Sequence, residues 1–287
     1  MPCSEEQNGL MGFPIGELRA RARIPFRLVA THAAIVQDFA ESLADAIQGR
    51  NALGLPTRLI LPVGPIAPYE ILVDLTNRHR ISWQNVHIFQ MDEWLDWQGR
   101  LIDEQHPLSF RGFMRRNFID RIDEDLRMPL NQFHFPHPFM PDSIQARIDA
   151  AGGVDFCYGG IGYHGHVAFN EPPLSRWHTV SVEELRQSKT RVVTLGADSI
   201  VVQSIGCAGG DPQAIPPMAV TLGMREILAA RKIRLYCAGG ERHRAVFRRA
   251  VAGEVSVAYP ATLVQGHPDA EVITDESTAA PITLGLR

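Results

Sequence analysis

The sequence predicts an α/β fold in which a mostly parallel sheet carries helices on both faces. Short apolar runs alternate with longer amphipathic ones along most of the 287 residues, and several of the apolar runs are typical of strands buried on both faces. The connections are long enough for the crossovers that parallel strands require. Ligands of such sheets bind beyond the carboxyl ends of the strands, so the residues that follow each strand are the first candidates for a site.

The expected strands are short runs rich in apolar and β-branched residues. In chain order they are Phe26–Ala30, Arg58–Val63, Val86–Gln90, Val154–Ile161, Met218–Leu222, Ile233–Ala238 and Glu271–Thr274. Helices are expected where apolar residues recur at helical spacing. They comprise one stripe of Ile35, Phe39, Leu43 and Ile47, another of Ile71, Leu72 and Leu75, and segments near 107–121, 143–151, 223–231 and 241–253.

The chain is expected to form one catalytic domain. Residues 1–20 lack apolar periodicity and are expected to be an N-terminal tail or surface arm, which leaves residues 21–287 as a single α/β domain. With 45% hydrophobic residues, this length can bury one large core. No apolar run approaches the roughly 18 residues of a membrane helix and no signal stretch is visible, so we expect a cytoplasmic protein.

Charge and cysteine usage narrow the class of partner. A net charge of −4 without an extended basic run argues against nucleic acid or an anionic membrane and favours a small molecule. A homo-oligomer stays open. The cysteines form no CxxC pair, so neither a disulfide framework nor a zinc knuckle is indicated. They are Cys3, Cys157, Cys207 and Cys237.

Two adjacent carboxylates follow the predicted strand Val86–Gln90. Asp92 and Glu93 would be partly desolvated at the edge of an apolar strand, and desolvation raises a carboxyl pKa toward the range of a general base. The alternative is that one of them caps the next element. The pair alone therefore does not decide between a catalytic and a structural role.

The strand predicted at 154–161 enters a turn dense in glycine. Gly160 and Gly162 lie where the backbone can approach a ligand closely, and His164, His166 and Glu171 follow. A histidine titrates near neutral pH, and a carboxylate within hydrogen-bonding reach would orient its ring and raise its pKa. Such a pair, able to donate or accept a proton, suits the opening of a sugar ring.

Six sequence blocks resemble, in matching order, the glucosamine-6-phosphate deaminase/isomerase family over about residues 26–278. The most specific block is GGIGYHGHVAFNEP at 159–172, because the sister 6-phosphogluconolactonase family shares GGxGxxGH but usually lacks FNEP. The others are MDEW at 91–94, HPLSFRGFMRRNF at 106–118, MAVTLGMREIL at 218–228, LVQGHP at 263–268 and VITDEST at 272–278.

This resemblance implies a modified Rossmann-type fold and an aldose–ketose conversion of an amino sugar with loss of ammonia. It implies that Asp92 is the base that moves a proton between C2 and C1 of the open-chain sugar, and that His166 assists ring opening with Glu171 as its partner. Neither a redox cofactor nor a metal is needed for that chemistry. The residues expected to bind the substrate are Gly64, Glu93, Gly160, Gly162, Asn170, Arg242 and His243.

The histidine loop departs from the family pattern at one position. The family usually has an aspartate two residues before the histidine, where this chain has His164. Two imidazoles close together resist being protonated together. The pKa of His166 should therefore be less elevated than in the family, and ring opening is expected to involve His164.

The phosphate site departs further. The family's small-residue loop is replaced by PVGPIAP at 62–68, which has no hydroxyl and whose prolines remove N–H donors. A family arginine aligns with Gly196, close to Arg191, and a family lysine aligns with His243. Arg242, His243 and Arg244 either supply positive charge at a helix start or are solvated. The substrate is accordingly an amino sugar, its phosphate, or a differently acidic sugar.

Three alternatives are retained. A lactonase would use His166 to activate water, but the FNEP block and Asp92 weigh against it. A non-catalytic sugar-binding regulator would need none of Asp92, His166 and Glu171, so the presence of all three argues against it. A metal site would accept a mixed set of nitrogen and oxygen ligands, although the spacing is not diagnostic. Its ligands would come from His164, His166, Asp92, Glu93 and either His106 or His134.

Overall fold

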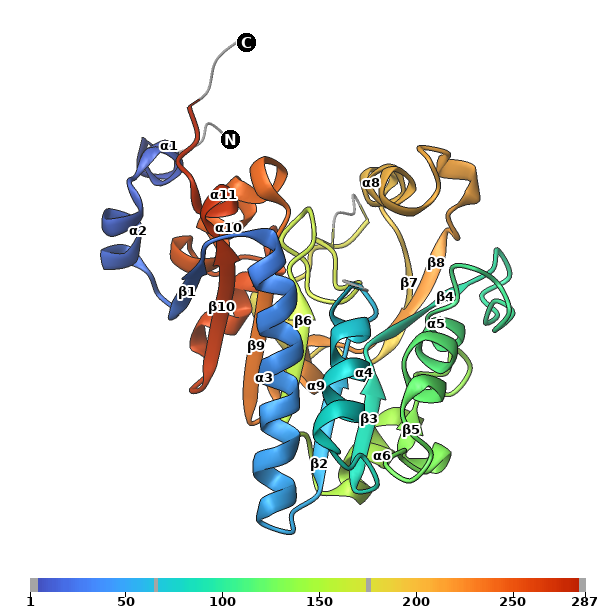
Figure 1. Ribbon diagram of the computed structural model, residues 1–287. Helices are drawn as coiled ribbons and strands as arrows, with labels where there is room; N and C mark the ends of the chain where they lie inside the picture. Colours follow the sequence, from blue (N-terminus) through green and yellow to red (C-terminus); the bar gives the residue numbers. More distant parts are fainter. Residues whose placement is uncertain (1–4, 65–66, 174–176, 284–287) are drawn as a thin grey trace.

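The computed structural model describes residues 5–64, 67–173 and 177–283, which are built around a seven-stranded sheet (Figure 1). The strand order is β1-β10-β9-β6-β2-β3-β5, and neighbouring strands are parallel. The predicted mostly parallel sheet is therefore confirmed. The strands are β1 (Phe26–Val29), β2 (Thr57–Leu61), β3 (Val86–Gln90), β5 (Phe133–His134), β6 (Phe156–Gly160), β9 (Lys232–Cys237) and β10 (Ala270–Asp275).

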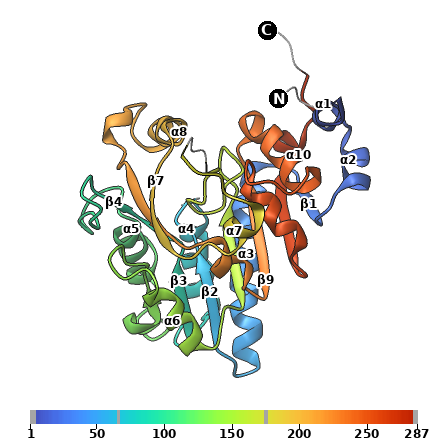
Figure 2. The ribbon, with the colours of Figure 1, turned by 180° about the vertical axis from the view of Figure 1, so that it is seen from behind.

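Helices cover both faces of this sheet, and each face has its own core (Figures 1 and 2). Successive residues of a strand point to opposite faces, so Ile60 enters one core while Leu59 and Leu61 enter the other. The first core is covered by α6 (Ser143–Ala151), α9 (Met224–Leu228) and α10 (Arg244–Ala252). The second is covered by α3 (His32–Ala52), α4 (Ala67–His79) and α5 (Phe110–Asn117).

A separate antiparallel sheet has the order β4-β8-β7. The predicted strand Met218–Leu222 forms, but it belongs to this smaller sheet as β8 (Met218–Thr221). Its neighbours β4 (Asp92–Leu95) and β7 (Arg191–Thr194) were not predicted. Asp92 and Glu93 are poor strand formers, and β7 alternates between half-buried and exposed residues. Helices α7 (Val182–Arg186) and α8 (Ala197–Cys207) flank β7 in the sequence.

Short helices complete the connections. A four-residue helix, α11 (Glu276–Ala279), follows β10, and 3₁₀ helices occupy Ile119–Arg121, Leu130–Gln132, Pro212–Ala214, Gly240–His243 and Pro260–Gly266. In the described parts of the chain, no helix is long and apolar enough to cross a membrane.

The N-terminal segment differs from the expected tail. It forms α1 (Glu5–Gly12) and α2 (Ile15–Arg21), and Leu10 and Leu18 are buried in the first core. The guanidinium of Arg248, itself fully buried, donates to the carbonyls of this segment and to those at the end of α11. The acceptors are Leu10 O at 3.0 Å, Phe13 O at 2.9 Å, Ala279 O at 2.8 Å and Ala280 O at 3.3 Å. Sequence reasoning missed this because α1 is too short for a clear apolar period.

We predict that Arg248→Ala destabilises the protein and releases the N-terminal segment. The substitution leaves buried carbonyl groups without donors, so the free energy of unfolding should fall by about 3 kcal/mol. Urea unfolding measures this loss, and limited trypsin digestion should cleave after Arg19 or Arg21 faster than in the wild type. Arg242→Ala, at an exposed position, is the control and should change stability by less than about 0.5 kcal/mol. Equal stability of the two variants would contradict the role of Arg248.

Candidate active site

A cavity of about 500 Å³ opens at the carboxyl ends of β2, β3, β6 and β9. The strand order reverses between β2 and β6, because the chain proceeds from β2 toward β3 but from β6 toward β9. Such a switch point separates the loops that follow the two strands and leaves a crevice for a ligand. The predicted site residues that line this cavity are Gly64, Asp92, Gly160, Gly162, His166 and His243.

Asp92 lies where the chain passes from the parallel sheet to the antiparallel one. The backbone of the preceding residue fixes this passage: Met91 N donates to Leu61 O, and Met91 O accepts from Leu222 N, both at 2.9 Å. Asp92 is 6% exposed, and burial together with the adjacent Glu93 carboxylate raises its pKa to about 8. The sequence predicted this direction, which suits a general base working near neutral pH.

Glu93 has a structural role and is not among the residues that line the cavity, so its contact with substrate stays a prediction. It is fully buried, and its carboxylate accepts from the backbone N–H groups of Trp94, Phe110 and Arg111 and from the Ser109 hydroxyl, at 2.8–3.2 Å. Two of these N–H groups begin α5, where a negative charge is favoured. The capping alternative therefore holds for Glu93 but not for Asp92, which faces the cavity.

The segment 159–172, here called the glycine loop, brings His166 to the cavity. Ile161 and Val167 form an antiparallel bridge, and Gly165 has a left-handed backbone with φ +71°. A Cβ atom at Gly162 would lie 1.9 Å from Nε2 of His166, so no other residue fits there. Ala168 has φ +54°, a strained conformation for a residue with a side chain, and it lines the cavity.

His166 and Glu171 lie near one another but form no hydrogen-bonded pair. Nδ1 of His166 and Oε1 of Glu171 are buried without partners in the described part of the chain, while Oε2 of Glu171 accepts from Gly196 N at 2.8 Å. Burial, with contributions from His164 and His243, lowers the pKa of His166 to about 3. The expected elevation by a carboxylate is therefore wrong, because desolvation of the ring outweighs it.

His164 is paired with a residue that sequence reasoning missed. Its Nε2 is hydrogen-bonded to Oδ2 of Asp198, and the Ser199 hydroxyl lies 3.4 Å from its Nδ1. Asp198 comes from the first turn of α8, 34 residues away in the sequence. No spacing rule links residues this far apart. His164 therefore has a carboxylate partner from a neighbouring helix.

Asn170 anchors the glycine loop through its side-chain amide. Its amide nitrogen donates to Val167 O at 3.0 Å and to Leu222 O at 2.8 Å, and its Oδ1 accepts from Arg191 at 2.9 Å. The side chain is fully buried and is not among the residues that line the cavity, so its contact with substrate stays a prediction. Arg191 was a candidate to bind a substrate phosphate, but its guanidinium donates to Asn170.

The expected anion site near 242–244 is only partly present. His243 lines the cavity, and burial lowers its pKa. Arg242 is exposed, and Arg244 is paired with Glu241 at 3.2 Å and donates to Ser277 O at 2.9 Å. In the loop at 62–68, Pro65 and Ile66 lie outside the described residues.

The cavity is also lined by residues that the sequence did not suggest. They include His32, Trp94, Phe110, Phe113, Gln203, Cys207 and Tyr236.

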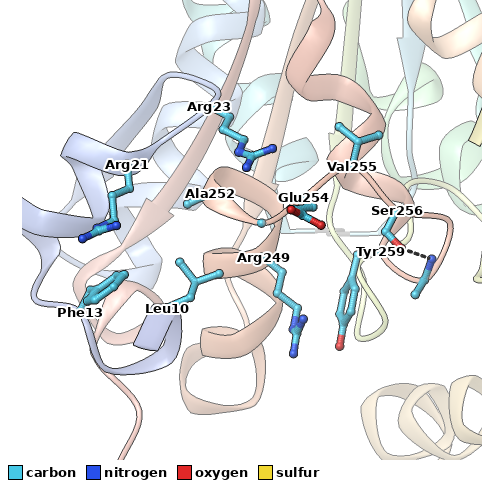
Figure 3. Close-up of a pocket in the computed structure, with 12 residues that line it drawn as sticks. Leu10, Phe13, Arg21, Arg23, Arg249, Ala252, Glu254, Val255, Ser256 and Tyr259 are labelled. Carbon is cyan, nitrogen blue, oxygen red and sulfur yellow. Dashed lines mark hydrogen bonds between the residues drawn. The ribbon is translucent and has the colours of Figure 1, made fainter. Parts of the chain in front are cut away.

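A second cavity, of about 700 Å³, lies between the N-terminal segment and the end of α10 (Figure 3). Arg21, Arg23 and Arg249 line it, and the guanidinium of Arg249 lies 4.6 Å from the ring centre of Tyr259. Neither Asp92 nor His166 lines this cavity. The chemistry expected from the sequence therefore belongs to the smaller cavity.

The metal ligands considered from the sequence do not converge as expected. Among the described residues, one group has the geometry to hold a cation, and it consists of His164, His166 and Glu171. Asp92 and Glu93 are not in it. His134 stacks on Phe89 with ring centres 5.0 Å apart, and His106 is exposed and accepts from Leu108 N.

Known proteins resemble this chain in sequence and in structure, although no protein-family model matches it. A glucosamine-6-phosphate deaminase of Parabacteroides distasonis is 34% identical over 236 residues, which are 81% of this chain and 79% of the relative. The structure of a monomeric glucosamine-6-phosphate deaminase, at 24% identity, superposes with a TM-score of 0.74 over 89% of this chain and 99% of that chain. A 6-phosphogluconolactonase of Shewanella baltica, at 20% identity, gives 0.62 over 88% and 97%.

We predict that Asp92→Asn stabilises the folded protein at alkaline pH. The unfolded carboxyl ionises near its ordinary pKa of 3.8, whereas the folded one keeps its proton up to about pH 8. Between these values the folded state binds more protons, so wild-type stability falls as pH rises. The variant lacks this loss and should be more stable by about 2 to 5 kcal/mol above pH 8, with no difference below pH 4. Urea unfolding at pH 4–9 tests this, and a difference that does not vary with pH would contradict it.

Proposed function

Because this chain belongs to the glucosamine-6-phosphate deaminase family, we propose that it converts an amino sugar from an aldose to a ketose with release of ammonia. The observation that carries the proposal is the buried Asp92 carboxylate in the wall of the cavity, with its pKa near 8. A carboxylate with this pKa is a strong enough base to take a proton from carbon next to a carbonyl group.

In the proposed reaction Asp92 takes the proton from C2 of the open-chain sugar and returns it to C1. Together with transfer of one amine proton to the C1 oxygen, this shift gives a C1 hydroxyl and a C2 imine, and water then hydrolyses the imine to a ketone and ammonia. The buried His166 Nδ1 and Glu171 Oε1 have no partner among the described residues, so each is available for a further hydrogen bond. His166 lines the cavity and is the residue that we assign to ring opening.

The charge of the cavity supports a sugar without phosphate. Among the described residues that line it there is neither lysine nor arginine, and the polar lining includes His32, Gln203 and His243. The nearby Arg191, Arg242 and Arg244 are anchored, exposed or paired with other groups. A phosphate dianion in this cavity would lack the charge-assisted hydrogen bonds that usually hold it.

The free thiols of Cys157, Cys207 and Cys237 support a cytoplasmic location within the same proposal.

We predict that Asp92→Asn lowers turnover of the amino sugar by about 10²- to 10⁴-fold, because the amide cannot take a proton. In the wild type, kcat/KM should rise with pH and level off above about pH 8, as the carboxyl loses its proton. Ammonia and ketose are measured separately in the same assay. Asp96→Asn is the control, since that carboxylate accepts only from the turn N–H groups of Gln98 and Arg100, and it should retain activity.

Full activity of Asp92→Asn would exclude this mechanism. Release of a sugar acid without ammonia would identify the lactonase alternative. Sugar binding without any turnover would identify the regulator.

We predict that glucosamine or a related free amino sugar is preferred over its 6-phosphate. Because neither lysine nor arginine is among the described residues that line the cavity, the phosphate loses the equivalent of at least one charge-assisted hydrogen bond, so kcat/KM for the free sugar should be roughly tenfold higher or more. Parallel assays of the two forms at equal concentration decide this. A preference for the phosphate would contradict the charge argument while leaving the role of Asp92 intact.

A further inference from the structure

Three potential metal ligands lie together beside the cavity that contains Asp92. One ligand atom from each of His164, His166 and Glu171 lies within 4.8 Å of the other two. All three come from the glycine loop, so one local fold holds the whole cluster. Imidazole nitrogen and carboxylate oxygen are the donors that zinc and other first-row divalent cations accept.

Two of these side chains have buried atoms that lack a partner. Nδ1 of His166 and Oε1 of Glu171 make no hydrogen bond to any described group, and His166 is only 9% exposed. An unpaired buried polar atom costs about 1 to 3 kcal/mol. A cation that accepts a lone pair from each of them would remove this cost.

His164 is held in the way that metal-bound histidines are held. Asp198 is hydrogen-bonded to its Nε2, and its Nδ1 has the Ser199 hydroxyl as a distant neighbour at 3.4 Å. A carboxylate on one ring nitrogen fixes the orientation of the ring and makes the other nitrogen a better ligand. The geometry therefore leaves Nδ1 as the available donor.

We propose that His164, His166 and Glu171 bind one Zn²⁺ ion, with Asp198 as the positioning residue for His164. Donors bonded to tetrahedral zinc lie roughly 3.3 Å apart, so the three ligand atoms, which lie within 4.8 Å of one another, move closer together by at most about 1.5 Å on binding. Three protein ligands leave one position open. Because His166 also lines the cavity, this position would accept a sugar oxygen that otherwise bonds to His166 directly.

This inference goes beyond the proposed function, because the cation binds in the absence of sugar and of turnover. The isomerisation itself needs no metal, so the site would be an addition specific to chains with histidine at position 164. The experiment therefore reads metal binding alone and does not depend on activity.

The test is a titration of the untagged, chelator-treated full chain with ZnCl₂, monitored by calorimetry. We expect one ion bound per chain. His164→Ala and Glu171→Gln should each weaken binding by at least about 100-fold, and Asp198→Asn, which changes the hydrogen-bond partner of His164 Nε2, by about 10- to 100-fold. Near-ultraviolet circular dichroism of each variant verifies that the fold is retained.

Two controls make the outcome specific. His79→Ala changes an exposed histidine at the end of α4 and should bind zinc as the wild type does. Asp92→Asn should also bind zinc normally, which separates this site from the proposed catalytic base. Absence of stoichiometric binding by the wild type, or unchanged affinity in His164→Ala and Glu171→Gln, would overturn the proposal, as would loss of zinc in Asp92→Asn.

Discussion

The site depends on how two adjacent carboxylates are buried where β3 of one sheet continues into β4 of another. Met91 belongs to the hydrogen-bonding pattern of both sheets, pairing with Leu61 on one side and Leu222 on the other. The carboxylate of Glu93 is fixed by four donors around the start of α5. Because neighbouring side chains of a strand point to opposite sides, this fixation directs Asp92 into the cavity. The carboxylate of Glu93, which has a structural role, thus determines where the carboxylate of Asp92 points.

The glycine loop is constrained from several directions at once. Gly162 leaves room for the His166 ring, Asn170 ties the loop to the end of β8 and to Arg191, and Phe169 N donates to the Thr221 hydroxyl at 3.1 Å. Tyr259 packs against Gly165, where an added Cβ would lie 3.0 Å from the ring. With so many contacts, the strained backbone of Ala168 can persist, and the ring of His166 is held although its Nδ1 has no hydrogen-bond partner among the described residues.

The sequence predicted the central strands and the location of the site because both depend on local patterns. Val86–Gln90 is a strand with the predicted bounds, and Asp92 and His166 line one cavity as expected. What it could not predict depends on distant contacts. The donors around Glu93 lie up to 18 residues away, and the partner of His164 lies 34 residues away. Likewise, the burial of Leu10 and Leu18 depends on α10 and α11, at the other end of the chain.

The histidine at position 164 determines the charge that lies next to His166 in the glycine loop. An aspartate there would place a negative charge next to His166 and favour its protonated form. His164 instead places a second imidazole beside His166, and the Asp198 carboxylate that is hydrogen-bonded to its Nε2 is 61% exposed at its side chain. His166 therefore stays neutral under burial, with lone pairs available on a buried imidazole. A neutral imidazole can accept a hydrogen bond from a sugar hydroxyl or bind a cation, whereas a charged one can do neither.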